Sequence, residues 1–524
     1  MIAGAPCGRE RSRGTSGRTG PRPPRGGFVL GFAVALLAGA CADDPEESAD
    51  GGAEFADGAV EARVDDAGDG DAGPSDVDGP DEVDGAADDA GAPEDIRVLL
   101  GRVPGLTVTS MGGSGGTLRF ELVYRQPVDH AAPGGPSFGQ SMTLTYVSSE
   151  APTVLMTEGY ANMWGFERAE PALLLDANQL VVEHRYFGES VPSPPDWTKL
   201  DIAQAAEDHH RIVEALHPIL AGPWVSTGYS KGGMTAVYHR RFHPDDVVGT
   251  VAYVAPISFG APDPRYLPFV AGAGDADCRA RLGEVQREAL LRRDSLQPRL
   301  TPALYGRIGG VERAFESVVL EVPFTFWQYH GAATCGAVPP VPGATDDALF
   351  GFIDRVVGFD SAGDDVLDWF APYYYQAWAQ LGFPDVDRAH LAGLLRTGVP
   401  SVEEGVLPVG ATPPTFDPSA MVDIARWVAE EGERLIFVYG QWDPWTAGAF
   451  DSGAAADSFR FFVAAGTHSS QLADLPVAEQ AVAHDALERW TGVTVRSLPK
   501  AAIPAPHLPR TPFLRWDPPP CPGP

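Results

Sequence analysis

The sequence of 524 residues lacks three features, and each absence narrows the range of functions. Its five cysteines form no C-x-x-C pair and no H-E-x-x-H occurs, so the usual spacings of metal ligands are missing. Lys and Arg number 38 against 71 Asp and Glu, which argues against a nucleic-acid partner. No apolar run reaches the about 20 residues that a membrane-spanning helix needs. We therefore expect no metal, no other cofactor and no bound nucleic acid.

The N-terminal residues 1–41 have the pattern of an export signal. Scattered arginines precede the apolar run FVLGFAVALLAGA, which ends at Cys41. A basic region, an apolar region and a small-residue end are the parts of such a signal. LAGAC resembles a bacterial lipobox whose leucine lies one position early, and Ala38-Gly39-Ala40 also fits an ordinary A-x-A cleavage site. We favour a lipid anchor at Cys41 outside the cytoplasm, with free secretion as the alternative.

Residues 42–97 are predicted to be a disordered acidic tether. Up to residue 95 this segment is almost entirely Ala, Gly, Asp, Glu and Pro, with Arg63 as its lone arginine. Such a composition buries too little apolar surface to offset the entropy lost on ordering. The segment accounts for most of the net charge of −33, so the folded part should be only mildly acidic.

The three cysteines beyond the tether allow one disulfide. In an exported protein Cys278 and Cys335 could pair. Cys521 would then remain alone in residues 499–524, a Pro-rich tail.

Strand-like and helix-like segments alternate in the rest of the chain, which predicts an α/β fold with a mostly parallel sheet. Residues 98–261 and 426–498 carry the strand patterns and form the expected core. Residues 262–425 are helical and aromatic, and are expected to form a cap inserted between the core strands, with most aromatics in its own core. The main strand patterns are TLRFELVY, SMTLTYVSS, PTVLMTEGY, NQLVVEH, WVST, VVGTVAYVAP, RLIFVYGQW and FRFFVAAGT.

The pattern G-x-S-x-G occurs twice, and its context separates the two copies. Around Ser114 it lies in GGSGG before the alternating strand TLRFELVY, which predicts a hairpin turn. Around Ser230 it lies between the apolar run WVST and the helical segment KGGMTAVYHRRF, which Pro244 closes. Strand, sharp turn and helix are what a nucleophile elbow needs. Ser230 is therefore the predicted nucleophile.

Asp443 and His468 each follow a later strand pattern. The chain order Ser, Asp, His is the order of the catalytic triad in α/β-hydrolases. A serine hydroxyl is a poor nucleophile until an imidazole accepts its proton, and a carboxylate fixes the tautomer of that imidazole. We therefore predict an α/β-hydrolase core with Ser230, Asp443 and His468 as its triad.

An oxyanion hole should use two backbone N–H groups near the nucleophile. One belongs to Lys231, the residue after the nucleophile. The other is expected from Tyr160 in the loop after PTVLMTEGY, where Gly159 would allow close approach. The alternative for this loop is an ordinary β-turn.

Five further stretches of the chain are EHRYFGES (183–190), DWTKLDIAQAAEDHHRIV (196–213), TGYSKGGMTAVYHRRFHPDDVVGTVAYVAPIS (227–258), FWQY (326–329) and PYYYQAW (372–378). These motifs resemble those of the secreted mycelial tripeptidyl aminopeptidase family of serine peptidases, and the resemblance runs over about residues 110–495. EHRYFGES and the elbow are more remotely similar to the prolylcarboxypeptidase and dipeptidyl peptidase group. The acidic tether and lipid anchor are not features of the resembled family.

The resemblance implies a peptide substrate and release of short peptides, typically tripeptides, from a free N-terminus, often after proline. It maps the same three catalytic positions as the elbow argument. A substrate α-amino group that enters a closed site needs a carboxylate partner. The candidates are Glu158 and Glu183 at strand ends, and Glu321 and Asp360 in the cap. Acids at strand ends are also common structural residues, and in EHRYFGES the alternative is that Arg185 pairs with a core carboxylate.

Two other functions use the same features. A capped lipase or carboxylesterase would need the same triad and an apolar cap pocket. A surface lipoprotein could use the fold only to bind, although a binding protein has no need for an intact triad. The long motifs favour the peptidase.

Overall fold

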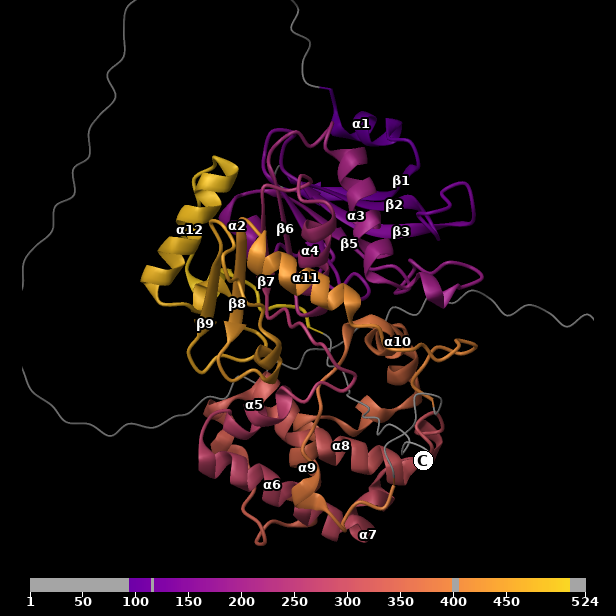
Figure 1. Cartoon of the computed structure of the whole chain (residues 1–524), viewed down its shortest axis with the longest axis vertical. Helices are drawn as coiled ribbons and strands as arrows, with labels where there is room; N and C mark the ends of the chain where they lie inside the picture. The colour runs from indigo at the N-terminus through magenta and orange to yellow at the C-terminus, as the bar shows by residue number, and fades with distance from the viewer. Residues whose placement is uncertain (1–93, 115–116, 398–404, 509–524) are drawn as a thin grey trace, which may run out of the picture. The chain divides into compact units, whose positions relative to one another are not determined.

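The computed structural model describes residues 94–114, 117–397 and 405–508, and within them the chain forms a nine-stranded sheet (Figure 1). The strand order is β1-β2-β3-β5-β4-β6-β7-β8-β9. Strands β4 to β9 are parallel, while β1, β2 and β3 are antiparallel and join the sheet through β5. The predicted mostly parallel sheet of an α/β-hydrolase fold is confirmed. The strands are β1 (Leu106–Ser114), β2 (Thr117–Pro127), β3 (Ser137–Tyr146), β4 (Thr153–Thr157), β5 (Asn178–Val182), β6 (Trp224–Tyr229), β7 (Gly249–Tyr253), β8 (Leu435–Gly440) and β9 (Phe459–Val463).

The central strands are largely apolar because helices cover both faces of the sheet. Every residue of β4 to β8 is buried. Ile436 and Val438 of β8 pack in the cluster that contains α12, and Phe437 between them packs in the cluster that contains α4 and α11. Ser114 ends β1 and pairs with Thr117, so it lies at the predicted hairpin. The helices of this core are α1 (Ile96–Arg102), α2 (Glu170–Leu174), α3 (Ile202–Leu216), α4 (Lys231–Phe242), α11 (Ser419–Glu430) and α12 (Val477–Thr491), with the short η1 (Trp197–Lys199), η9 (Pro444–Gly448), η10 (Leu472–Asp474) and η11 (Lys500–Ala502).

Residues 266–391, between β7 and α11, form a helical layer at the end of the sheet, drawn below it in Figure 1. Its aromatic side chains are mostly buried in the layer's own core. A disulfide joins Cys278 of α6 to Cys335 of η5 across this layer. The helices are α5 (Tyr266–Gly272), α6 (Ala276–Leu291), α7 (Arg293–Leu296), α8 (Val311–Thr325), α9 (Asp346–Val356) and α10 (Asp364–Gln376), with the π-helical η4 (Phe326–His330) and η7 (Ala377–Leu381) and the 3-10 turns η2 (Gln297–Arg299), η3 (Pro302–Leu304), η5 (Ala332–Ala337), η6 (Phe359–Ala362) and η8 (Ala389–Leu391).

Three predicted boundaries differ from the structure. Helix α1 begins at Ile96, inside the predicted tether, because Asp95 caps it by accepting from the backbone N–H of Arg97. Helix α11 begins at Ser419 and contacts α4 of the core, so the cap ends before the predicted residue 425. A helical pattern does not say which layer the helix joins. The predicted tail begins with η11, which the core holds through Lys500.

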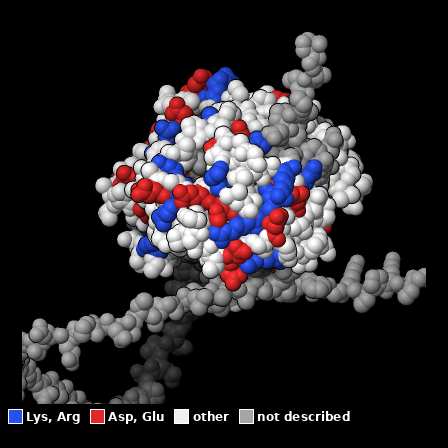
Figure 2. Space-filling model, turned by 90° about the horizontal axis from the view of Figure 1, so that it is seen from below, with Lys and Arg blue, Asp and Glu red and all other residues white. Residues whose placement is uncertain are grey.

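The export signal, Cys41, nearly all of the predicted tether and Cys521 lie outside the described residues. Among the helices that the structure does describe, none is both long and apolar enough to cross a bilayer. Figure 2, which views the molecule from the cap end, shows basic and acidic side chains interspersed. Among the described cap residues, Arg299 forms an ion pair with Asp347 at 2.8 Å.

Candidate active site

Ser230 lies on a strained turn between β6 and α4. Its backbone has φ 54° and ψ −124°, outside the regions that a non-glycine residue ordinarily adopts. Strand and helix approach closely here: a Cβ on Gly228 would lie 2.4 Å from the backbone of Gly232, and one on Gly232 would lie 2.5 Å from the carbonyl oxygen of Thr157. Glycine is therefore required at both positions. The turn presents the Ser230 hydroxyl at the carboxyl end of the sheet.

The three residues of the predicted triad lie within hydrogen-bond distance of one another. His468 Nε2 is 2.8 Å from Ser230 Oγ, and His468 Nδ1 is 2.6 Å from Asp443 Oδ2. Because a carboxylate can only accept, Nδ1 donates to Asp443 and Nε2 is left to accept the serine proton. This arrangement can activate a serine hydroxyl for acyl transfer.

Neighbouring groups hold the aspartate and the histidine in place. Asp443 is fully buried, and its Oδ1 accepts from the backbone N–H of Trp445. Burial raises the pKa of the Asp443 carboxyl, while the adjacent His468 lowers it. The backbone N–H of His468 donates to the carbonyl oxygen of Gln328 in η4 at 2.8 Å, and the ring of Tyr329 packs edge-on against the imidazole. The cap therefore helps to orient the triad histidine.

The predicted oxyanion donors line the same cavity as the nucleophile. Tyr160, Ser230 and Lys231 all border it. A Cβ on Gly159 would lie 2.6 Å from that of Lys231, so the loop after β4 needs glycine to lie against the elbow. Among the described residues, the backbone N–H groups of Tyr160 and Lys231 have no hydrogen-bond acceptor. Two such N–H groups beside a serine can stabilise an oxyanion.

The Lys231 side chain has a role that the sequence did not indicate. It is buried, and its Nζ donates to the carbonyl oxygen of Gly159 at 2.6 Å. Burial lowers the pKa of this amine well below its usual value. The contact ties the start of α4 to the loop that carries Tyr160, so Lys231 positions the oxyanion loop.

Glu158 and Glu183 lie near the elbow, where both accept hydrogen bonds from backbone groups. Glu158 accepts from the N–H groups of Met163 and Trp164. Glu183 accepts from the backbone N–H groups of residues 162, 189 and 190 and from the hydroxyl of Ser190. Burial raises the pKa of Glu158 to about 8, helped by the charge of Glu183, so Glu158 is largely protonated at neutral pH. These contacts shape the loops after β4 and β5. They engage both oxygens of Glu183 and Oε1 of Glu158, and a protonated Glu158 is a poor partner for a substrate ammonium.

The other two candidate acids lie in different environments. Glu321 of α8 is buried, and its charge contributes to raising the pKa of Tyr373, which borders the cavity beside Ser230. Asp360 is exposed on η6, where it lies near Tyr305, and it does not border that cavity. The structure therefore brings Glu321, and not Asp360, toward the triad.

The structure confirms the alternative in which Arg185 of EHRYFGES pairs with a core carboxylate. It is fully buried and forms two hydrogen bonds with Asp208 of α3, at 2.6 Å and 2.8 Å. A bidentate pair of this kind fixes both side chains. The motif thus joins β5 to α3 beneath the loops of the site.

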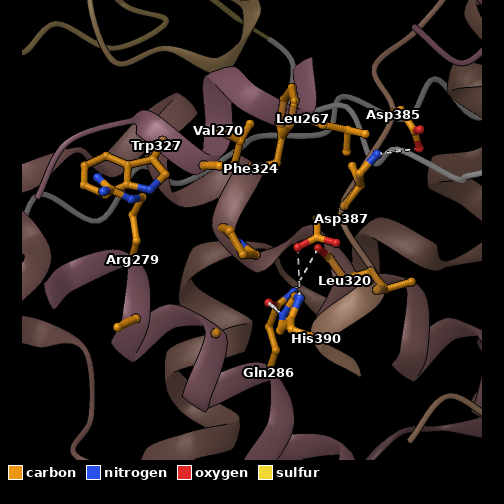
Figure 3. Close-up of a pocket in the computed structure, with 15 residues that line it drawn as sticks. Leu267, Val270, Arg279, Gln286, Leu320, Phe324, Trp327, Asp385, Asp387 and His390 are labelled. Carbon is orange, nitrogen blue, oxygen red and sulfur yellow. Dashed lines mark hydrogen bonds and ion pairs between the residues drawn. The ribbon is translucent and has the colours of Figure 1, made fainter. Parts of the chain in front are cut away.

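A larger cavity, of about 280 Å³, lies within the cap (Figure 3). Phe324 and Trp327 line it on one side, and His390 faces Asp387 and Gln286 on the other. Phe324 also packs edge-on against Trp445, a residue that borders the Ser230 cavity. An aromatic layer therefore separates the cap cavity from the triad.

The sequence interpretation did not identify the residues through which the cap contributes to the site. Gln328 and Tyr329 contact His468, and Tyr373 and Leu381 border the Ser230 cavity. Gln328 and Tyr329 belong to the motif FWQY and Tyr373 belongs to PYYYQAW, while Leu381 lies outside both. Both motifs lie at α-helix ends that continue as π-helical turns, a feature common at functional sites.

Comparisons with known proteins agree with this geometry. A family model described as PS-10 peptidase S37 matches residues 91–509. The prolyl tri/tetrapeptidyl aminopeptidase of Streptomyces mobaraensis is 42% identical over 416 residues, which cover 78% of this chain and 87% of the relative. The lysosomal Pro-X carboxypeptidase of Mus musculus is 33% identical over 125 residues, which cover 22% of this chain and 24% of that one.

Among solved structures, the proline iminopeptidase of Mycobacterium smegmatis matches with a TM-score of 0.33 and 14% identity, covering 70% of this chain and 98% of its own. The fold assignment depends on the strand order and not on this match. The resemblance inferred from the motifs is confirmed by the family model and by the Streptomyces relative. The chain therefore belongs to the PS-10 peptidase S37 family and is a serine peptidase.

Proposed function

We propose that the protein is an extracytoplasmic serine exopeptidase that releases short peptides, of three or four residues, from free N-termini, often after proline. The observation that carries the proposal is the hydrogen-bonded triad beneath a cap that contacts its histidine. The name of the Streptomyces relative supplies the length of the released peptide and the proline preference.

The proposed reaction proceeds through an acyl-enzyme. Ser230 Oγ attacks the scissile carbonyl carbon as its proton moves to His468 Nε2, and Asp443 stabilises the resulting imidazolium. The N–H groups of Lys231 and Tyr160 donate to the oxyanion. His468 then protonates the leaving amine, and the C–N bond breaks. Water, deprotonated by the same imidazole, hydrolyses the ester and restores the Ser230 hydroxyl.

Glu321 is the proposed partner of the substrate α-amino group. It is the candidate acid that lies in the cap and next to a residue of the Ser230 cavity. Its side chain is only 2% exposed, so a bound ammonium would meet a desolvated carboxylate. This contact would fix the distance between the N-terminus and the bond that is cut.

A pair of chromogenic tripeptides tests the exopeptidase assignment. The free peptide should be cleaved about ten- to a hundred-fold faster than its N-acetyl form, since acetylation leaves a buried carboxylate without its partner at a cost of about 1 to 3 kcal/mol. Glu321→Gln should remove most of this difference. The control Asp360→Asn, which changes an exposed cap acid, should keep it. Equal cleavage of both peptides by the wild type would refute the exopeptidase assignment and favour a capped endopeptidase.

The location outside the cytoplasm is also part of the proposal. A basic region followed by an apolar run up to Cys41 supports export, and the Cys278–Cys335 disulfide fits an oxidising compartment. Cells grown with radioactive palmitate should label the wild type but not Cys41→Ala. A wild-type protein that is found outside the cytoplasm without label would support secretion in place of the anchor.

A further inference from the structure

A cluster of histidines and carboxylates lies where the end of α4 meets α3, away from the triad. His210, His243 and Asp246 each offer a ligand atom, and these atoms lie within 4.8 Å of one another. Figure 1 shows α3 and α4 on the same face of the sheet. Ser230 precedes α4 and His243 follows it, so the cluster is about 18 Å from the nucleophile, the length of a helix of 12 residues.

The cluster is built from two short acid–histidine spacings. Glu207 and His210 lie three residues apart on α3, and His243 and Asp246 lie three residues apart at the end of α4. His210 Nδ1 is 2.9 Å from both oxygens of Asp246, and His243 Nε2 is 3.2 Å from Glu207 Oε2. Asp246 therefore lies beside His210 of α3, and Glu207 of α3 lies beside His243.

Two contacts in the cluster, His210 to Asp246 at 2.9 Å and His243 to Glu207 at 3.2 Å, are close to the spacing that a metal ion imposes, while the ligand atoms of His210, His243 and Asp246 together lie within 4.8 Å. A tetrahedral ion bonded at about 2.0 to 2.1 Å holds its ligand atoms about 3.3 Å apart. The two imidazoles are stacked, with ring centroids 3.9 Å apart. Both side chains are partly exposed, so rotation of one ring toward the Asp246 carboxylate can bring the three ligand atoms around one ion.

A buried histidine fixes the orientation of Asp246 by a hydrogen bond, as is usual for metal-binding carboxylates. His239, which is fully buried, lies with its Nε2 2.7 Å from Asp246 Oδ2. Since a carboxylate can only accept, Nε2 donates this hydrogen bond. Its other nitrogen, Nδ1, has no hydrogen-bond partner among the described residues. The buried imidazole therefore serves to orient Asp246, as outer partners of metal ligands do.

We propose that His210, His243 and Asp246 bind one zinc ion, with Glu207 as the fourth ligand. Two imidazoles and carboxylates suit zinc and similar divalent ions, whereas magnesium and calcium prefer oxygen ligands alone. The ion would join α3 to the end of α4 and stabilise the layer that carries the nucleophile. The sequence did not predict this site, because the ligands come from two elements and match no continuous metal motif.

Calorimetric titration of the tag-free full chain with zinc chloride, after removal of metals with EDTA, tests the proposal. The wild type should bind zinc at one saturable high-affinity site per chain and should not bind magnesium there. His210→Ala and His243→Ala should each weaken zinc binding at least about 100-fold, more than loss of an outer partner usually does. His507→Ala is the matched control, because it removes a histidine that pairs with a single acid, Glu167, and it should bind as the wild type does.

Two further readouts make the test decisive. Zinc should raise the midpoint of thermal unfolding of the wild type and leave that of the His210→Ala/His243→Ala double variant unchanged. Tripeptide hydrolysis should be unaffected by the double variant, which shows that the variant is folded and separates this site from the peptidase function. Absence of saturable zinc binding by the wild type, or equal binding by the double variant, would overturn the proposal.

Discussion

Replacing Glu158 by glutamine should change how the stability of the protein depends on pH. In the folded protein the pKa of Glu158 is raised to about 8 from its usual 4.5, mainly by burial. Between these two values the folded protein keeps a proton that the unfolded chain releases. Stability from this group is therefore fully present below about pH 4.5 and is lost as the pH rises toward about 8.

The magnitude follows from the shift in pKa. Within this window each pH unit costs about 1.4 kcal/mol of unfolding free energy. Between about pH 5.5 and about pH 7.5 the wild type should therefore lose roughly 2 to 3 kcal/mol that Glu158→Gln does not lose. Glutamine keeps a carbonyl oxygen that can accept from the N–H groups of Met163 and Trp164, so the loop should retain its shape.

Urea unfolding of both proteins at several pH values in this range measures the difference. Buried acids that do not interact with Glu158 affect both proteins equally, so the gap between the two curves reports Glu158 together with its interaction with Glu183. The control Glu189→Gln, an exposed acid in the neighbouring loop, should run parallel to the wild type. Parallel curves for Glu158→Gln and the wild type would refute the raised pKa of Glu158.

Two further predictions concern positioning and stability. Lys231→Met should lower kcat about ten-fold with little change in KM. The reason is that the loop that carries Tyr160 loses its hydrogen bond from Lys231 to Gly159, while the triad stays intact. Steady-state kinetics measure both constants, and an unchanged kcat would contradict the prediction. Replacing Cys278 and Cys335 together by alanine should destabilise the cap by about 4 kcal/mol, since their disulfide closes a separation of 57 residues. Thermal unfolding measures the loss, and a midpoint equal to that of the oxidised wild type would contradict the prediction.

The triad could be predicted from the sequence because its signals are local. The elbow needs glycines at fixed positions around Ser230, and the parallel sheet brings the ends of β8 and β9 to the same edge. Asp443 and His468 each follow one of these strands. Chain order and strand ends were therefore enough to bring the three residues together.

Features that depend on contacts between distant segments could not be predicted in the same way. The pattern of Glu158 and Glu183 at strand ends does not reveal that both carboxyl groups accept hydrogen bonds from loop N–H groups. The contact between Gln328 and His468 joins segments that are 140 residues apart. Helical periodicity likewise did not show that α11 packs against α4 of the core as well as against η7 of the cap, since both layers offer it an apolar surface.

Reaction with a fluorophosphonate, followed by mass spectrometry and tripeptide hydrolysis, tests the central role of Ser230 most directly. We predict one adduct per chain on the peptide that contains Ser230, and loss of activity in proportion to labelling. Ser230→Ala should take no label and should lose activity on the order of a million-fold. Ser114→Ala, which changes the other G-x-S-x-G copy, should label and hydrolyse as the wild type does. An adduct on another residue, or hydrolysis by Ser230→Ala near the wild-type rate, would contradict the account.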